Sequence, residues 1–298
     1  MLEVNGLSKS YNGVNVVKDF QVHVKKGHIY GVVGPNGAGK TTFFKMLAGL
    51  VIPTAGTVKV SNGEPIESYR QKMSFMIEAP YLYENMTAMD NMKIIGGIKG
   101  EKDVQKMKGL LELVKLDPLS RKKVKKFSLG MRQRLGIACA LTSNPEILVL
   151  DEPMNGVDPE GIVELRETLL WLCEEKNITM LISSHILGEL AQLSSDFIFV
   201  KQGCIVKQIE KETLQHMENG NVQIATTKLE ETYRFICEKY DPSSVVLRND
   251  YIEMKTDVGE ESKISKMLVD AGFCITKMNV ETLDLEQYYM KEIVGNEA

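Results

Sequence analysis

The sequence predicts an α/β fold in which helices cover a parallel sheet, and three features indicate it. A nearly all-apolar, β-branched run from His28 to Gly34 is typical of a buried central strand. It leads directly into a glycine-rich loop and then into a run at 40–50 that suits a helix. Two further apolar runs, 146–153 and 178–185, are separated by a helix that opens at Asp158-Pro159. Strands and helices that alternate in this way predict a covered parallel sheet.

The residues before this sheet have the pattern of antiparallel strands. Residues 4–27 alternate short apolar runs with turn signals, and Asn12-Gly13 is a favoured hairpin turn. Between about 85 and 144 the pattern becomes helical, and Asp103 caps a helix at 103–114 whose apolar residues recur at helical spacing. We expect a helical subdomain over about 85–144, inserted into a first domain of residues 1–210.

A second, smaller α+β domain is expected over residues 211–298. Its pattern is a strand at 221–228, a helix at 229–240, a hairpin through Asn249-Asp250, a helix at 261–272 and a strand at 273–281. The order β-α-β-β-α-β is the ferredoxin-like layout.

Composition excludes several classes of protein. The chain has 298 residues and a net charge of -4, which argues against a nucleic-acid partner, and its basic run at 121–126 suits a solvated loop. Five scattered cysteines without C-x-x-C spacing suggest neither disulfides nor zinc, and fit a reducing cytoplasm. No apolar run approaches the ~18 residues that span a bilayer. We therefore expect a cytoplasmic protein that meets any membrane from outside the lipid.

The glycine-rich loop predicts a nucleotide site. Residues 34–41 match the pattern G-x-x-x-x-G-K-[ST] in full, in the strand–loop–helix context of a P-loop NTPase. In such loops backbone N–H groups point at phosphate oxygens, Lys40 reaches the β- and γ-phosphates, and Thr41 offers its hydroxyl to Mg²⁺. We therefore expect ATP and Mg²⁺ as ligands. The loop residues expected to bind the nucleotide are Gly34, Pro35, Asn36, Gly37, Ala38, Gly39, Lys40, Thr41 and Thr42.

Two carboxylates follow the strand at 146–153. Asp151 and Glu152 should lie at the carboxyl edge of the sheet, where open α/β sheets hold their ligands. Asp151 would hold Mg²⁺, and Glu152 could accept a proton from an attacking water. Two acids after a strand more often cap a helix, but the phosphate loop upstream reverses that preference.

A second anion site is predicted at the start of another helix. Ser128 and Gly130 open a helix whose free N–H groups and dipole favour phosphate. The run from Phe127 onwards, followed by a strand that ends in Asp-Glu, resembles the signature segment of ATP-binding cassette (ABC) proteins. Their usual L-S-G-G-Q is matched at the serine and the second glycine. The corresponding signature residues are Ser128, Leu129, Gly130 and Met131, with methionine in place of glutamine.

This resemblance spans residues 1 to about 210 and implies further roles. Tyr11 stands where the family stacks an aromatic ring on adenine, although a tyrosine of a structural hairpin would look the same. Asn155 to Asp158 matches the segment through which two subunits communicate. His185 matches the switch histidine that contacts the γ-phosphate, so the implied catalytic set is Lys40, Glu152 and His185.

Glu78 occupies a position where most cassettes carry a glutamine that senses Mg²⁺. The resemblance therefore adds Glu78 to Thr41 and Asp151 as a metal-site residue. Glutamate there is characteristic of family members that protect bacteria from lantibiotics, and the surrounding sequence is similar to bacitracin-resistance ATPases. A chance glutamate in an unrelated exporter is the alternative.

The resemblance implies the ATP-hydrolysing subunit of an ABC exporter that works with separate membrane permease subunits at the inner face of the membrane. Two chains, identical or related, would dimerise on ATP, with the Ser128 region of each covering the nucleotide at Lys40 of the other. The alternative is a soluble ABC-type ATPase acting on nucleic acid or the ribosome. DNA-repair relatives insert coiled coils and translation factors usually carry two cassettes, and the sequence has neither feature. A nucleotide-binding regulator without turnover would lack Glu152 or His185.

Overall fold

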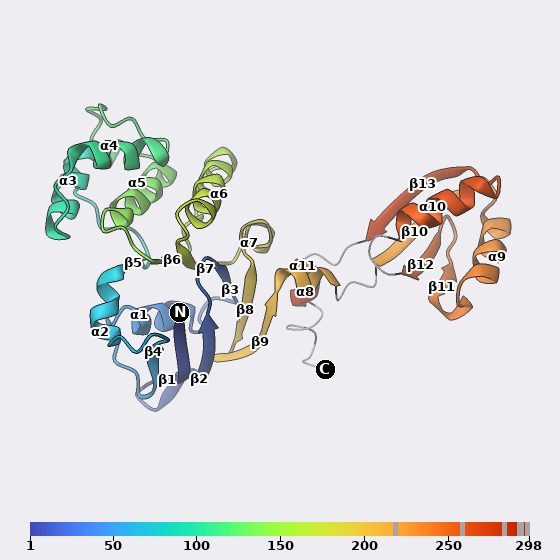
Figure 1. Ribbon diagram of the computed structural model, residues 1–298, viewed down its shortest axis with the longest axis horizontal. Coiled ribbons are helices and arrows are strands. Elements are labelled where there is room, and N and C mark those ends of the chain that lie inside the picture. The colour runs from blue at the N-terminus through green and yellow to red at the C-terminus, as the bar shows by residue number, and fades with distance from the viewer. Residues whose placement is uncertain (217–219, 257–259, 282–284, 291–294, 296–298) are drawn as a thin grey trace. The chain divides into compact units, whose positions relative to one another are not determined.

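The computed structural model divides into two compact units, Met1–Ile209 and Glu210–Ala298 (Figure 1). It describes residues 1–216, 220–256, 260–281, 285–290 and 295. Among these residues, no helix is both long and apolar enough to cross a membrane.

The first unit is built on a six-stranded sheet in the order β5-β6-β7-β3-β8-β9. In chain order its strands are β3 (Ile29–Val33), β5 (Met73–Met76), β6 (Ile147–Asp151), β7 (Thr179–Ser184), β8 (Asp196–Lys201) and β9 (Cys204–Glu210). The pairs β5–β6, β6–β7, β7–β3 and β3–β8 are parallel. The predicted parallel sheet, with the strand before the glycine loop in its interior, is confirmed.

The first unit also contains a second, smaller sheet. Strands β1 (Leu2–Tyr11), β2 (Val14–Val24) and β4 (Ala55–Val60) pair antiparallel in the order β2-β1-β4. The turn between β1 and β2 is the predicted one, with φ of 49° at Asn12 and 80° at Gly13. Positive φ at both central residues is what a type I′ hairpin requires.

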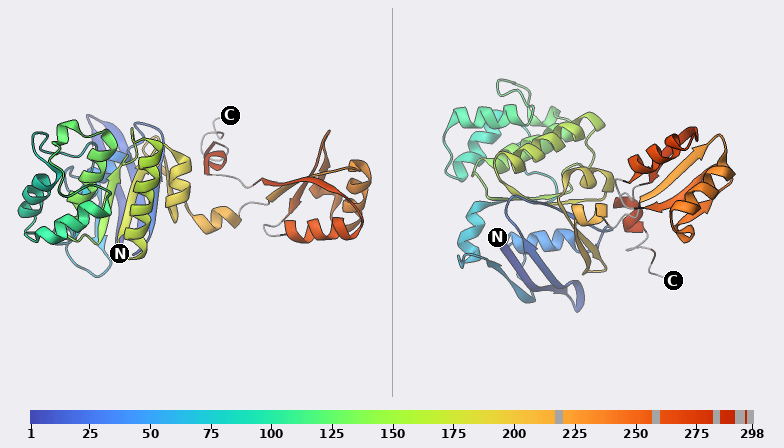
Figure 2. Two further views of the ribbon diagram at one scale, coloured as in Figure 1. Left: turned by 90° about the horizontal axis from the view of Figure 1, so that it is seen from above. Right: turned by 45° about the vertical axis from the view of Figure 1, so that its right-hand side comes forward.

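Helices cover the central sheet and form the predicted insertion. They are α1 (Lys40–Leu47), α2 (Ile66–Tyr69), η1 (Arg70–Lys72), α3 (Ala88–Ile98), α4 (Val104–Leu113), η2 (Val124–Lys126), α5 (Leu129–Leu141), α6 (Pro159–Glu174) and α7 (Leu187–Leu193). The expected helix caps are present. The Asp103 side chain accepts hydrogen bonds from backbone N–H groups of α4, and the Asp158 side chain accepts one from the Gly161 N–H of α6. Helices α3 to α5 and strands β1 and β2 lie at opposite ends of this unit (Figures 1 and 2).

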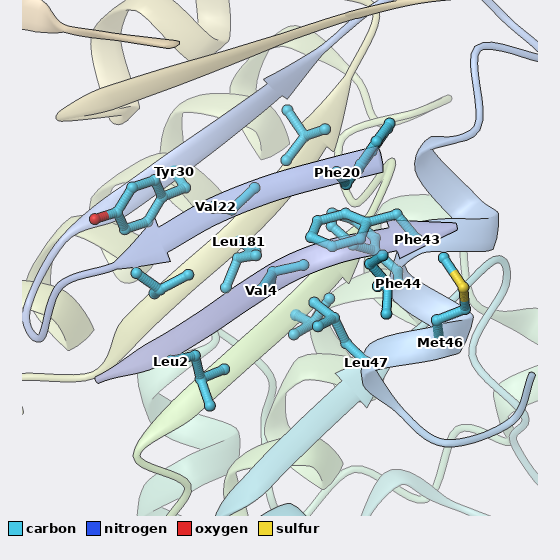
Figure 3. Close-up of a cluster of buried hydrophobic side chains, with 14 of the residues drawn as sticks. Leu2, Val4, Phe20, Val22, Tyr30, Phe43, Phe44, Met46, Leu47 and Leu181 are labelled. Carbon is cyan, nitrogen blue, oxygen red and sulfur yellow. The ribbon is translucent and has the colours of Figure 1, made fainter. Parts of the chain in front are cut away.

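Helix α1 fixes the phosphate loop through the core of the first unit. Its Phe43 and Phe44 are fully buried, and Phe43 lies 5.3 Å from the Phe20 ring of β2, centroid to centroid. Val4 of β1 and Leu181 of β7 belong to the same cluster (Figure 3). Because both sheets contribute to this cluster, burying it holds the start of α1 at the edge of the central sheet.

The second unit has the predicted β-α-β-β-α-β order. Its elements are α8 (Lys211–His216), β10 (Gly220–Thr226), α9 (Leu229–Lys239), η3 (Pro242–Ser244), β11 (Val245–Leu247), β12 (Ile252–Thr256), α10 (Glu261–Asp270), β13 (Ile275–Glu281) and α11 (Leu285–Tyr288). Its sheet is antiparallel in the order β11-β12-β10-β13, the ferredoxin-like arrangement. Ile236 of α9 and Ile264 of α10 pack with strand residues in a core of its own.

Candidate functional site

The glycine loop lies between β3 and α1 and holds its lysine in an ordered position. The Lys40 side chain is 6% exposed, and its Nζ donates to the carbonyl oxygens of Gly34 at 2.6 Å and Pro35 at 3.2 Å. Gly39 has a φ of 107°, and a Cβ there would lie 2.7 Å from the Val16 carbonyl oxygen, so only glycine suits the position. A cavity of about 180 Å³ is lined by Val16, Asn36, Gly37, Ala38, Gly39, Lys40, Thr41, Thr42 and Glu152.

The ammonium of Lys40 lies close to Glu152, which also lines this cavity. Its Nζ lies 3.8 Å from Oε1 of Glu152. Burial lowers the pKa of Lys40, while the charges of Glu152 and Asp151 oppose that shift. A buried ammonium at the start of a helix suits a multiply charged phosphate.

Asp151 ends β6 and is buried with both carboxylate oxygens hydrogen-bonded. Its Oδ2 accepts from Oγ1 of Thr41 at 2.7 Å, and its Oδ1 accepts from Oγ of Ser183 at 2.5 Å. The structure therefore brings together two of the three residues predicted for the metal. A carboxylate and a hydroxyl fit the oxygen-ligand chemistry of Mg²⁺, which proteins usually bind through one or two carboxylates together with waters and substrate phosphates. Within the described part of the chain, no cluster of three or more His, Cys, Asp or Glu could hold a metal ion.

Glu152 is held at the same edge by β7. Its backbone has a φ of 52°, and its N–H donates to Oγ of Ser183 at 2.9 Å and to the Ser183 carbonyl oxygen at 3.2 Å. Its Oε2 lies 2.7 Å from Nδ1 of His185 and accepts from the His185 N–H at 3.2 Å. A left-handed backbone at a residue other than glycine is strained, and these contacts hold it in place.

Ser183 is the site residue that sequence reasoning missed. Its hydroxyl contacts both Asp151 and the backbone of Glu152, so it fixes both acids. The available signal was a pair of hydroxyls, Ser183 and Ser184, that closes an apolar strand just before His185.

Two other predicted residues lie outside this cluster of contacts. Tyr11 ends β1, is exposed, and has Nζ of Lys9 5.0 Å from its ring centroid. Glu78 has a φ of 63°, and its Oε1 forms an ion pair with Nζ of Lys45 at 2.7 Å, which raises the pKa of Lys45. The structure therefore pairs the Glu78 carboxylate with a lysine of α1.

The predicted signature segment starts α5. Ser128 caps the helix, with its Oγ accepting from the Met131 N–H at 3.2 Å. A Cβ at Gly130 would lie 3.0 Å from Cγ1 of Val157, and one at Gly156 would lie 2.5 Å from Cδ2 of Leu129. The signature segment therefore packs closely against the loop 155–158 of its own chain.

Comparisons with known proteins agree with this geometry. A family model described as ABC transporter matches residues 17–155. The ABC transporter ATP-binding protein YcbN of Bacillus subtilis (strain 168) is 37% identical over 99% of this chain and 98% of its own length. The bacitracin transport ATP-binding protein BcrA of Bacillus licheniformis is 34% identical over 99% of this chain and 98% of its own length.

Further similarities cover about three quarters of the chain. The lantibiotic transport ATP-binding protein SrtF of Streptococcus pyogenes is 39% identical over 73% of this chain and 94% of its own length. A solved structure of an ATP-binding subunit of an ABC transporter is 28% identical, with a TM-score of 0.65 over 73% of this chain and 92% of that one. Full-length similarity to such subunits, together with the phosphate loop and the paired acids, assigns the chain to the ABC transporter ATP-binding proteins, the subunits that bind and hydrolyse ATP to energise transport.

Proposed function

We propose that this ATPase energises the export of a peptide antibiotic of the bacitracin type through separate membrane permease subunits. The similarity to the bacitracin transport protein covers 99% of the chain, whereas that to the lantibiotic transport protein covers 73%. The similarity to the bacitracin transport protein therefore extends over the second unit as well as the first. We propose that the protein is cytoplasmic and that it reaches the inner face of the membrane only by binding its permease.

The observation that supports catalysis best is the joint anchoring of Asp151 and Glu152 beside Lys40. In our proposal, the loop N–H groups and Lys40 bind the β- and γ-phosphates, and Thr41 and Asp151 hold Mg²⁺. When bound, Mg²⁺ neutralises phosphate charge during transfer. Tyr11 is proposed to stack on adenine, because its exposed ring stands at the end of β1.

Glu152 is the proposed general base. Its carboxylate lines the cavity beside the phosphate loop, where it can accept a proton from an attacking water. His185 orients this carboxylate through the 2.7 Å contact of its Nδ1 and is proposed to contact the γ-phosphate when ATP is bound. We propose that Glu78 does not bind Mg²⁺ while its carboxylate is paired with Lys45.

The active form is proposed to be a dimer of two such chains, or of this chain with a related ATPase. Ser128 and Leu129 start a helix of the inserted subdomain, and the Leu129 side chain is exposed. Each signature segment would cover the nucleotide bound at the partner's phosphate loop, so that binding energy closes the dimer and hydrolysis opens it.

The permease is proposed to contact the segment that runs from Glu78 to Tyr83. The Tyr81 side chain is 95% exposed, and a cavity of about 290 Å³ beside it is lined by apolar residues that include Pro80 and Leu82. An exposed aromatic side chain next to an apolar cavity is typical of a protein interface.

The test is the variant Glu152→Gln. We expect it to bind ATP normally and to hydrolyse it at least ~100-fold more slowly, because a lost general base typically costs this much. Lys40→Ala should instead lose affinity for a fluorescent ATP analogue. Near-normal turnover of Glu152→Gln would remove this residue from the role of base.

The transported substrate is tested in cells. Deleting this gene should increase sensitivity to bacitracin, and the wild-type chain, unlike Glu152→Gln, should restore resistance. Unchanged sensitivity with an active ATPase would refute the proposed substrate and leave the enzyme intact.

A further inference from the structure

The first unit contains a third pocket, larger than the two described above and more apolar in its lining than the nucleotide cavity. Its volume is about 660 Å³, within the range of small-molecule sites. It lies where α4, the segment after α5 and the end of α6 meet, and it shares no lining residue with the cavity at the phosphate loop. Its apolar lining includes Leu110, Leu113, Leu141, Trp171, Leu172 and Ile178.

Three lysines surround this apolar interior. Lys106 is paired with Glu101 at 2.5 Å, whereas Lys26 and Lys176 are exposed. The Lys176 Nζ lies 5.1 Å from the centroid of the Trp171 ring. The one acid of the lining, Glu146, accepts a hydrogen bond from the hydroxyl of Tyr69 at 3.1 Å. The pocket therefore has apolar walls with a net positive rim; we call it the lysine-rimmed pocket.

We propose that the lysine-rimmed pocket binds an amphipathic organic anion, a molecule with an aliphatic or aromatic body and one carboxylate or sulfonate. The body would be buried against the leucines and Trp171, which removes apolar surface from water. The acid group would remain at the rim beside Lys26 and Lys176. An organic cation of the same size would be repelled there.

Such a ligand would contact two parts of the cassette at once. Helices α4 and α5 belong to the inserted helical subdomain, whereas α6 follows β6 of the central sheet. Helix α5 packs against both α4 and α6. A bound anion would therefore bridge the inserted subdomain and the sheet-bound helix.

The chain carries a built-in reporter for this site. Trp171 is the single tryptophan of the sequence, lines the pocket and is 39% exposed. Octanoate, 1-octanol and octyltrimethylammonium carry similar eight-carbon chains with a negative, a neutral and a positive head group, respectively. We expect octanoate to shift the Trp171 emission to the blue in a saturable way, with one octanoate bound per chain in equilibrium dialysis. Octanol and octyltrimethylammonium should bind at least about 3-fold more weakly, as expected when exposed ion pairs are lost.

A matched pair of glycine variants locates the site. Gly109 lines the pocket on α4, and a Cβ there would meet nothing within 4 Å. Gly97 on α3 has the same open space and lies outside the lining. Leucine raises helix propensity at both positions, so both variants should fold. We expect Gly109→Leu to weaken octanoate binding at least ~10-fold and Gly97→Leu to leave it unchanged.

The charge of the rim is tested separately. Lys176→Gln should weaken octanoate binding about 2- to 5-fold, as expected for an exposed ion pair, without altering octanol binding. Octanol bound as tightly as octanoate would overturn the anion preference. Equal octanoate affinity of the Gly109→Leu and Gly97→Leu variants, or the absence of stoichiometric octanoate in dialysis, would overturn the site.

Discussion

Replacing Ser183 by alanine tests how the two acids are held. The Ser183 hydroxyl is fully buried, donates to Oδ1 of Asp151 and accepts from the N–H of Glu152. Alanine removes both contacts with little change in volume. The Glu152 N–H keeps the Ser183 carbonyl oxygen at 3.2 Å, and Asp151 keeps the hydroxyl of Thr41.

The magnitude follows from these contacts. A hydrogen bond to a charged group contributes about 1.5–3 kcal/mol and a neutral one about 0.5–1.5 kcal/mol. Because each partner keeps a second bond, we expect the free energy of unfolding to fall by about 2–3 kcal/mol. Turnover should fall about 10- to 100-fold, since displacing a reacting group by ~1 Å can cost about 100-fold.

Ser184→Ala is the matched control. Ser184 is also buried, but its hydroxyl accepts a hydrogen bond from the Ile186 N–H at 3.0 Å and, among the described residues, contacts neither acid. The change should therefore leave turnover within about 2-fold. Urea unfolding followed by Trp171 fluorescence measures the first unit, and steady-state ATPase assays measure kcat. If Ser183→Ala matches Ser184→Ala in both stability and kcat, the serine does not position the acids.

Three further predictions follow from exposed and buried groups. Glu78→Gln should change the free energy of unfolding by less than about 1 kcal/mol, because the ion pair of Glu78 with Lys45 is exposed. The variant should keep its ATPase activity; a large loss of turnover would instead support Glu78 as a metal ligand. Burial raises the pKa of Cys139 to about 12, so iodoacetamide at pH 8 should alkylate exposed Cys274 and spare Cys139, as mass spectrometry would show; early labelling of Cys139 would contradict its burial. Gly156→Ala should lower the melting temperature, because its φ is 69° and the new Cβ would lie 2.5 Å from a signature side chain; an unchanged melting temperature would disprove this crowding.

The features that sequence predicted correctly depend on neighbouring residues in the chain. The phosphate-loop pattern and the Asn12-Gly13 turn each depend on a few consecutive residues, so the sequence contains the whole signal. The role of Ser183 depends instead on the register in which β6 pairs with β7, which sets it opposite Asp151. No local pattern reports that register, and the same holds for the ion pair of Glu78, which joins residues 33 positions apart.

A short segment links the acid of one phosphate site to the signature of the other. From Glu152 the chain turns through two backbone hydrogen bonds, from the Asn155 N–H to the Glu152 carbonyl oxygen at 3.1 Å and from the Val157 N–H to that of Met154 at 3.2 Å. Val157 then packs against Gly130 of the signature. Because this link is short and closely packed, we expect contacts with the signature segment to oppose a displacement of Glu152. In the proposed dimer, the acid at one nucleotide and the signature over the other would therefore be displaced together, so a chain with both proposed phosphate sites would couple one nucleotide to the other.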